Sequence, residues 1–283
     1  MAIIAGSIAN WVMLVIAFSI WFNLTKDYSV NAELYAALWA FGLMGSLIAV
    51  ALTPAGEAFF RFIQGCRLPI RAEEEKLLPI FRDVCRSANV DPDKYVLYVS
   101  DDKFPNAFAM GRKTVCVTRS LLNGSTEEEL QGILAHELGH HVHGDAARSI
   151  IFYMITLVGQ IIMLGGWAVT KVLGMIRAIT GAGRETGFSI IFSLFAGIVG
   201  LLVWFFQIFV WIPIFIGAYF GSRQQEYRAD TYAANIGYSE GLLMFLNRIL
   251  DLDGHPSGFM GLLYRTHPKT GSRIRRLEGV ETK

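Results

Sequence analysis

Long apolar stretches decide what this 283-residue chain can fold into. The first stretch, from Ile4 to Leu24, carries no charge and is long enough to cross a lipid bilayer, which takes about 20 apolar residues as a helix. It is apolar all round, so a buried helix of a soluble core is the less favoured interpretation. No basic segment precedes it and no clear cleavage site follows it, which favours a retained membrane helix over a signal peptide.

Three further apolar stretches follow: Leu34 to Leu52, Ile150 to Val172 and Phe188 to Phe220. A short polar turn joins the first two stretches of the chain, which predicts a helical hairpin. The last stretch is longer than one crossing needs, so we expect a crossing helix that continues past an interface near Pro213 toward Glu226. The glycine-rich, charged segment Met175 to Gly187 predicts a loop.

Composition narrows the class of protein further. The chain is 53% hydrophobic and 17% charged with a formal net charge of +1, so we expect membrane segments and no binding of nucleic acid. Its cysteines are Cys66, Cys85 and Cys116, an odd number without a C-x-x-C pair. This pattern argues against a disulfide framework and a cysteine zinc site, and it favours reduced thiols in a cytosol-facing domain.

The sequence His136-Glu137-Leu138-Gly139-His140 is an H-E-x-x-H motif. Histidines four residues apart share one face of a helix, so both imidazoles can reach one Zn²⁺. Glu137 lies in the same turn, where its carboxylate could take a proton from zinc-bound water.

The surrounding residues predict a helix from Ser125 to Gly144. Ser125-Thr126-Glu127-Glu128 is typical of a capping box, and an apolar stripe follows at helical spacing. The alternative is a partly buried helix with two incidental histidines. His141 and His143 lack ligand spacing, so we interpret them as exposed or hydrogen-bonded residues at the helix end, and Asp145 remains unassigned.

A catalytic zinc normally has three protein ligands, so a third must come from elsewhere. Glu226 is the candidate, and Asp230 shares its helical face. Glu226 can bind the metal while Asp230 accepts the free ring N–H of a ligand histidine. The alternative is an ordinary charged helix after an apolar stretch.

His136-Glu137-x-x-His140 followed by Glu226-x-x-x-Asp230 resembles the HtpX family of membrane zinc proteases, relatives of the CAAX prenyl proteases. The resemblance implies a mostly α, α+β integral membrane protein with about four transmembrane helices and a gluzincin-type zinc protease domain. It implies one Zn²⁺ per subunit, held by His136, His140 and Glu226. Glu137 would be the general base and Asp230 the residue that orients a ligand.

Two further segments resemble parts of the same family. Asn106-Ala107-Phe108 lies between predicted strands at Tyr95–Val99 and Lys113–Thr118, and it is similar to a substrate-binding edge strand. By the residues alone, an ordinary turn asparagine is the favoured interpretation of Asn106. Arg265-Thr266-His267-Pro268 is similar to the family's Thr-His-Pro segment, which implies that His267 stabilises the oxyanion and that Arg273, nearby, binds substrate. By the residues alone, a structural histidine is the favoured interpretation of His267.

These features predict four segments of chain. They are a transmembrane hairpin (1–52), a first protease part (53–149), two membrane-embedded helices (150–221) and a second protease part (222–283). Helices are expected over Glu73–Ala88 and Glu240–Leu252. Because His140 and Glu226 must meet at one metal, the crossings between them must be two or none.

Basic residues then suggest an orientation. Arg61, Arg67, Arg71 and Lys76 follow the second apolar stretch, and Arg223 and Arg228 follow the fourth. The opposite side carries Lys26, Lys171, Arg177 and Arg184. This bias favours a catalytic domain in the cytoplasm, and the resemblance implies a bacterial inner membrane.

The expected activity is metal-assisted hydrolysis of polypeptides, with membrane proteins as substrates. The resemblance implies quality control of damaged or misfolded membrane proteins. Alternatives are a dedicated processing protease of the CAAX prenyl type, a non-catalytic zinc-bound scaffold, and a transporter. Glu137 argues against a scaffold, because a structural zinc site has no use for a base there. A transporter would need charges within the membrane stretches.

Overall fold

The computed structural model describes residues 32–181, 223–251 and 270–281, together with residues 8, 11–12, 14–16, 18–19, 21–22, 194–195, 197–198, 200–201 and 204–205. The chain divides into two compact units. The first unit comprises Met1–Leu47 and Phe152–Gly217, and the second comprises Ile48–Ile151 and Ala218–Lys283.

Helix α2 (Ala32–Ala51) contains the apolar stretch predicted at Leu34 to Leu52. Within the described ranges, its segment Glu33–Ala51 is the one helix long and apolar enough to cross a membrane, with a mean hydropathy of 1.9. The first and fourth predicted membrane stretches lie largely outside the described residues.

Helix α7 (Asp145–Gly181) contains the third apolar stretch and extends beyond it. The prediction of a loop from Met175 is therefore wrong for residues 175–181. A single glycine at 174 weakens a helix without ending it, and the residues after it include strong helix formers such as Met, Arg and Ala. The remainder of the predicted loop lies outside the described residues.

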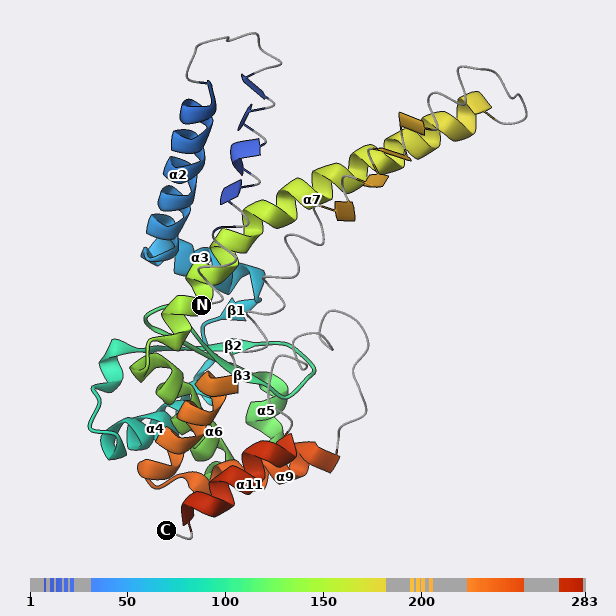
Figure 1. The fold of residues 1–283 in the computed structure, drawn as a ribbon. Coiled ribbons are helices and arrows are strands. Elements are labelled where there is room, and N and C mark those ends of the chain that lie inside the picture. Colours follow the sequence, from blue (N-terminus) through green and yellow to red (C-terminus); the bar gives the residue numbers. More distant parts are fainter. Residues whose placement is uncertain are drawn as a thin grey trace. The chain divides into compact units, whose positions relative to one another are not determined.

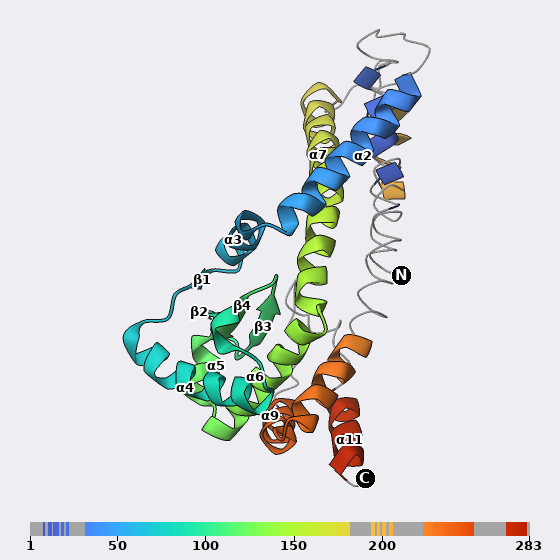
Figure 2. The same ribbon diagram turned by 90° about the vertical axis from the view of Figure 1, so that its left-hand side faces the viewer.

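The second unit combines a small sheet with helices (Figures 1 and 2). In chain order its elements are α3 (Pro54–Ile63), β1 (Cys66–Arg67), α4 (Arg71–Ser87), the 3₁₀ helix η1 (Pro92–Lys94), β2 (Val96–Ser100), β3 (Ala107–Met110), β4 (Thr114–Thr118), α5 (Arg119–Gly124), α6 (Glu127–Val142), a helix over residues 223–235, α9 (Ser239–Asp251) and α11 (Thr270–Glu281).

The four strands lie in the order β1-β2-β4-β3. β2 and β4 pair in parallel, with Val96 opposite Thr114, whereas β3 runs antiparallel to β4, with Ala107 opposite Val117. Every residue of β4 is buried, as expected for a strand covered on both faces. Because β3 is last in the strand order, it forms one edge of the described sheet, as predicted for the Asn106-Ala107-Phe108 segment.

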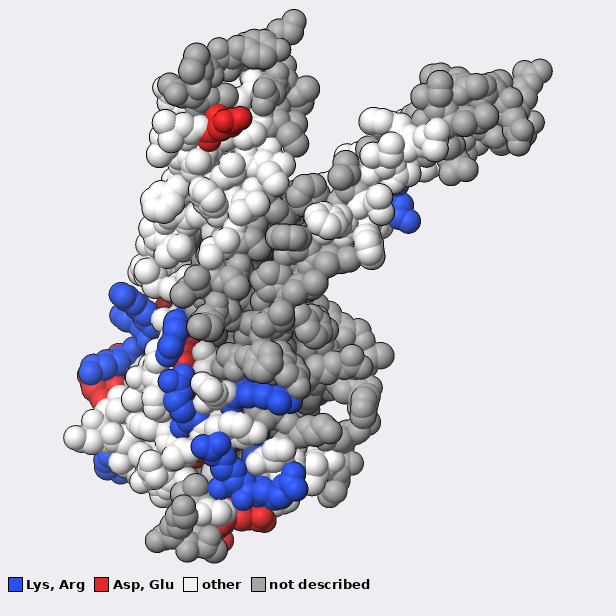
Figure 3. All heavy atoms as spheres, in the orientation of Figure 1, with Lys and Arg blue, Asp and Glu red and all other residues white. Residues whose placement is uncertain are grey.

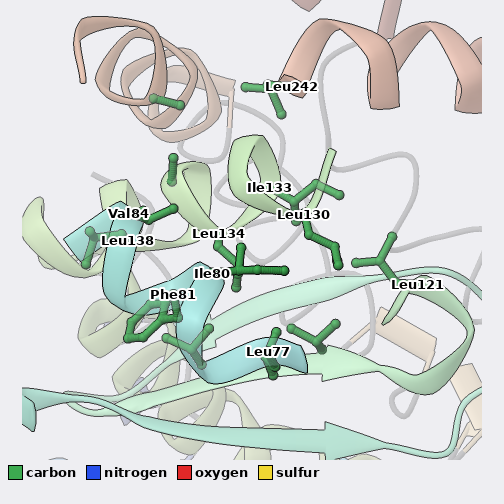
Figure 4. Packing of buried hydrophobic residues seen from close by; sticks show 14 of the residues in the cluster. Leu77, Ile80, Phe81, Val84, Leu121, Leu130, Ile133, Leu134, Leu138 and Leu242 are labelled. Atoms are coloured by element: carbon green, nitrogen blue, oxygen red, sulfur yellow. The ribbon is translucent and has the colours of Figure 1, made fainter. Parts of the chain in front are cut away.

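The core of the second unit lies where α4 and α6 pack on the sheet. Figure 4 shows the α4 side chains Leu77, Ile80 and Phe81 beneath Leu134 of α6, with Leu242 of α9 on the far side of α6. The apolar stripe predicted for α6 is confirmed as buried. This packing fixes the axis of the helix that carries the H-E-x-x-H motif.

Two glycines let α9 approach α6 very closely. A Cβ atom on Gly132 would lie 2.2 Å from the backbone nitrogen of Leu242, and one on Gly241 would lie 1.9 Å from the carbonyl oxygen of Glu128. Both distances are far below normal contact, so neither position tolerates a side chain without a shift of backbone.

The start of α6 differs by one residue from the sequence prediction. Thr126, not Ser125, is the N-cap: its hydroxyl accepts from the Glu129 N–H at 3.2 Å, and Glu129 Oε2 accepts from the Thr126 N–H at 3.0 Å. Ser125 with Glu128 and Thr126 with Glu129 both fit the capping-box pattern, and the structure has the second pair. Gly144, at φ +71°, follows the C-cap His143, which confirms the predicted stop.

Candidate active site

Two helices of the second unit bring three potential metal ligands together. Nε2 of His136 lies 3.2 Å from Nε2 of His140, one turn further along α6. The carboxylate of Glu226, on the helix over residues 223–235, lies 3.4 Å from the first imidazole and 3.5 Å from the second. Their ligand atoms all fall within 4.8 Å of one another.

These distances fit a single tetrahedral metal. Ligands about 2.0–2.1 Å from a tetrahedral ion lie about 3.3 Å from each other, which matches the spacing of His136, His140 and Glu226. Two imidazoles with one carboxylate are also a donor set that suits Zn²⁺ and leaves a fourth position open. The residues present therefore fit the metal that the sequence predicted.

The surrounding charges favour a cation at this place. Burial opposes protonation of His140, but the carboxylates of Asp145 and Glu226 outweigh it and raise the pKa of this imidazole to about 10. Burial and Arg273 oppose protonation of His136 in the same way, and Asp230 and Glu226 still raise its pKa. A bound metal would take the place of these protons, because its imidazole ligands must be neutral.

A carboxylate lies near Nδ1 of each of the two histidines, on the side of the ring away from the proposed ligand nitrogen. Nδ1 of His136 lies 2.9 Å from Oδ1 of Asp230, as expected of a residue that orients a ligand. Nδ1 of His140 lies 3.7 Å from Oδ2 of Asp145, at the start of α7. Asp145 is 2% exposed, and its Oδ2 has no hydrogen-bond partner among the described residues.

Arginine side chains form ion pairs with the carboxylates around the candidate metal site. Arg273 of α11 binds both Asp230 oxygens, at 2.9 and 2.6 Å, and its Nη1 lies 3.1 Å from Oε2 of Glu226. Arg228 and Arg148 hold Oδ1 of Asp145 at 3.0 and 2.8 Å. Arg273 is thus directed at the metal-site carboxylates, whereas the sequence suggested a place beside the substrate.

Glu137 lies between the cluster and the edge strand. It is 7% exposed, and its Oε2 accepts a hydrogen bond of 2.7 Å from the backbone N–H of Ala109 in β3. The carboxylate is therefore held in place by the strand predicted to take substrate, and its second oxygen remains to accept a proton.

The backbone of β3 shows which groups face away from β4. Asn106 donates its N–H to the Thr118 hydroxyl at 2.9 Å and accepts from the Thr118 N–H at 2.8 Å, so its backbone is directed at β4. Antiparallel pairing alternates along the strand, which places Phe108 in the next hydrogen-bonded pair. Ala107 and Ala109 therefore direct their backbone groups away from β4.

The other histidines have different places. His141 lies with Nε2 2.9 Å from the carbonyl oxygen of Thr114, and His143 lies with Nδ1 2.7 Å from that of Gly139. Both are hydrogen-bonded, as one of the two sequence interpretations held. His267 lies outside the described residues, so its proposed role in stabilising the oxyanion stays a prediction.

The chain is similar to known proteins. Residues 71–281 match peptidase family M48. The chain is 29% identical over 276 residues to the protease HtpX homolog of Campylobacter curvus, covering 84% of this chain and 89% of the relative. For the protease HtpX homolog of Dictyoglomus turgidum the identity is 30% over 235 residues, covering 75% and 72%.

A solved structure, that of Ste24p from S. mikatae, is also similar, with 17% identity and a TM-score of 0.48. The match covers 91% of this chain and 60% of that chain.

The chain belongs to peptidase family M48. It is a metallopeptidase of mostly helical α+β fold, and its resemblance to the HtpX family is confirmed.

Proposed function

We propose that this protein is a zinc-dependent endopeptidase of the membrane that hydrolyses damaged or misfolded membrane proteins. The observation that carries the proposal is the cluster of His136, His140 and Glu226 beside a strand-bound Glu137. The resemblance to HtpX supports the quality-control role and a place in a bacterial inner membrane, and the basic residues after the apolar stretches support a cytoplasmic catalytic domain.

In this proposal His136, His140 and Glu226 hold the metal. When bound, the metal supplies Lewis acidity, which polarises a carbonyl and makes a coordinated water more acidic. Asp230 fixes the ring of His136 through Nδ1. Glu137, held at Oε2, accepts the proton of the attacking water on its other oxygen and later delivers it to the leaving amine.

The substrate peptide would lie extended along β3. Strand edges offer N–H and C=O groups that a peptide backbone can pair with, and Ala107 presents such groups away from β4. Asn106 and Phe108 would flank the peptide. About four transmembrane helices would hold this domain at the bilayer, of which α2 is the one within the described residues that is long and apolar enough.

The test compares wild type with Glu137→Gln. Both are reconstituted in lipid vesicles with a membrane-protein reporter, and bound metal is measured in each. We expect loss of cleavage by at least about a hundredfold with metal content kept, the size seen when general-base chemistry is removed. Retained cleavage in the variant would overturn the assignment of the base.

The same assay separates the alternatives. Cleavage of several unrelated membrane reporters supports quality control, whereas cleavage restricted to a prenylated C-terminal peptide would indicate a processing protease. Metal binding without cleavage of any reporter would favour a scaffold.

A further inference from the structure

Helix α3 has one buried face, which includes Glu57, and an opposite face that is apolar and exposed. Glu57 and Phe60 are buried, at 7% and 8% exposure. Phe59, Phe62 and Ile63 lie three and four residues apart, share the opposite face of the helix, and are 43%, 83% and 55% exposed. We call these three residues the apolar face of α3. Aromatic side chains exposed to this degree on one helix mark a surface that contacts something apolar.

The buried face of α3 is hydrogen-bonded to the turn between β3 and β4. The carboxylate of Glu57 accepts from the backbone N–H groups of Arg112 and Lys113, each at 3.2 Å, and from the Thr114 hydroxyl at 2.5 Å. Gly111 stands at φ +65° in the same turn, and a Cβ there would lie 2.5 Å from the Glu57 side chain. These contacts hold α3 against the turn that follows the edge strand β3.

The start of α3 packs closely against the end of α2 and is hydrogen-bonded to it. Two residues separate Ala51 from Pro54, and a Cβ on Gly56 would lie 2.2 Å from the carbonyl oxygen of Val50. The Thr53 hydroxyl donates to that carbonyl at 2.7 Å and caps α3 by accepting from the Gly56 N–H. α3 thus begins where the apolar segment Glu33–Ala51 ends.

This continuity indicates what covers the apolar face. If α2 crosses the bilayer, a helix that starts two residues after it lies at the depth of the lipid headgroups. A helix with Phe on one side and polar groups on the other is suited to lie in that interface. The exposed cations Arg112 and Lys113 lie in the turn held by Glu57, where they match anionic headgroups. Figure 3 shows basic side chains spread over the visible side of the second unit, some of them at the end where Figure 1 places α3.

We propose that α3 is a membrane-interface helix, in which Phe59, Phe62 and Ile63 enter the bilayer surface while Glu57 holds the β3–β4 turn. The edge strand beside Glu137 is thereby kept at the membrane surface, so the substrates it takes are polypeptide segments at or near that surface. This inference rests on the membrane embedding and the peptide-binding strand given under the proposed function.

The first test measures the depth of α3 directly. Phe62→Cys, in a Cys66→Ser background, carries a nitroxide label in the full-length protein in vesicles of zwitterionic and anionic phospholipid. The matched control is Arg82→Cys on the exposed side of α4. We expect the label at 62 to collide more with oxygen than with a water-soluble nickel chelate, and the label at 82 to show the reverse.

Three results would overturn the proposal. Equal exposure of both labels to the chelate would place the helix in water. Low collision with both reagents at position 62 would mean that a protein partner covers it. Dipolar broadening between labels would mean a second copy of this chain.

The second test uses activity. Phe62→Ser should lower cleavage of a membrane-anchored reporter about three- to tenfold, the range expected for the loss of one partly buried Phe side chain, while a short soluble peptide is cleaved at the wild-type rate. Equal loss on both substrates would contradict an anchoring role. If wild type cleaves neither substrate, the proposed function fails, and the label at position 62 still decides the place of α3.

Discussion

The backbone N–H of Ala109 donates a hydrogen bond to Oε2 of Glu137 across 2.7 Å. One strand edge therefore holds the proposed base and also directs the Ala107 backbone away from the sheet. Positioning of the carboxylate and pairing with an extended peptide depend on the same four-residue strand, β3 (Ala107–Met110).

Proline substitutions in β3 can separate these two roles. Ala107→Pro removes an N–H that does not bond β4, so the strand should fold while kcat/KM falls about tenfold through a higher KM, equivalent to one hydrogen bond to substrate. Ala109→Pro removes the N–H that holds Glu137 and should lower kcat instead. Steady-state kinetics with metal analysis distinguishes the two. Ala107→Val, which keeps its N–H, is the control, and unchanged kinetics in both proline variants would contradict peptide pairing at this edge.

Asp145 should support the metal site through His140. Asp145→Asn weakens the interaction with Nδ1 of His140, and we expect metal affinity to fall about ten- to hundredfold, as for other residues that orient metal ligands. Competition with a coloured chelator measures this without reference to activity. Asp83→Asn, at an exposed pair with Arg86, is the control. A loss of thermal stability with unchanged metal affinity would limit Asp145 to a structural role.

Arg273 could support the carboxylates of the metal site or contact the substrate, and one substitution distinguishes these roles. The guanidinium binds Asp230 with two nitrogens and Glu226 with a third, and lysine cannot reproduce that fork. We expect Arg273→Lys to weaken metal binding and to leave KM unchanged at saturating metal. A raised KM with normal metal affinity would instead support the substrate contact that the sequence suggested. Arg275→Lys, on the exposed side of α11, is the control.

Glu73 should contribute to stability in acid. A two-pronged ion pair with Arg67, aided by the Ile70 N–H, lowers its pKa from 4.5 to about 2 against the effect of burial. A lowered pKa means that this stabilisation is complete above pH 4.5 and is lost as the pH falls toward 2. Glu73→Gln should therefore unfold at lower temperature than wild type at pH 6, with the difference shrinking toward pH 2.

The control for this measurement is Glu75→Gln. Glu75 forms a solvent-exposed pair with Arg71, and such pairs contribute about 0–1 kcal/mol. Its melting temperature should follow wild type across the whole pH range. A Glu73 variant that does the same would contradict the assigned ion pair.

The sequence alone predicted which residues carry the proposed chemistry. Helical periodicity put His136, Glu137 and His140 on one turn, and the same rule paired Glu226 with Asp230. It also placed the strands at Tyr95–Val99 and Lys113–Thr118 close to their observed bounds, because turn residues and β-branched side chains mark them locally. Apolar length indicated α2 as a membrane helix, whereas the loop predicted from Met175 is wrong for residues 175–181, where the helix continues past Gly174 and through Arg177.

Only the tertiary structure decided which distant residues meet. Arg273 reaches Asp230 over 43 residues of chain, and Arg228 reaches Asp145 over 83. Glu57 accepts hydrogen bonds from the β3–β4 turn, which connects α3 to the strand proposed to bind substrate. The physical reason is that the periodicity of a sequence depends on neighbouring residues and shows only which residues share one face of a helix. Contacts between elements depend on how all the elements pack together.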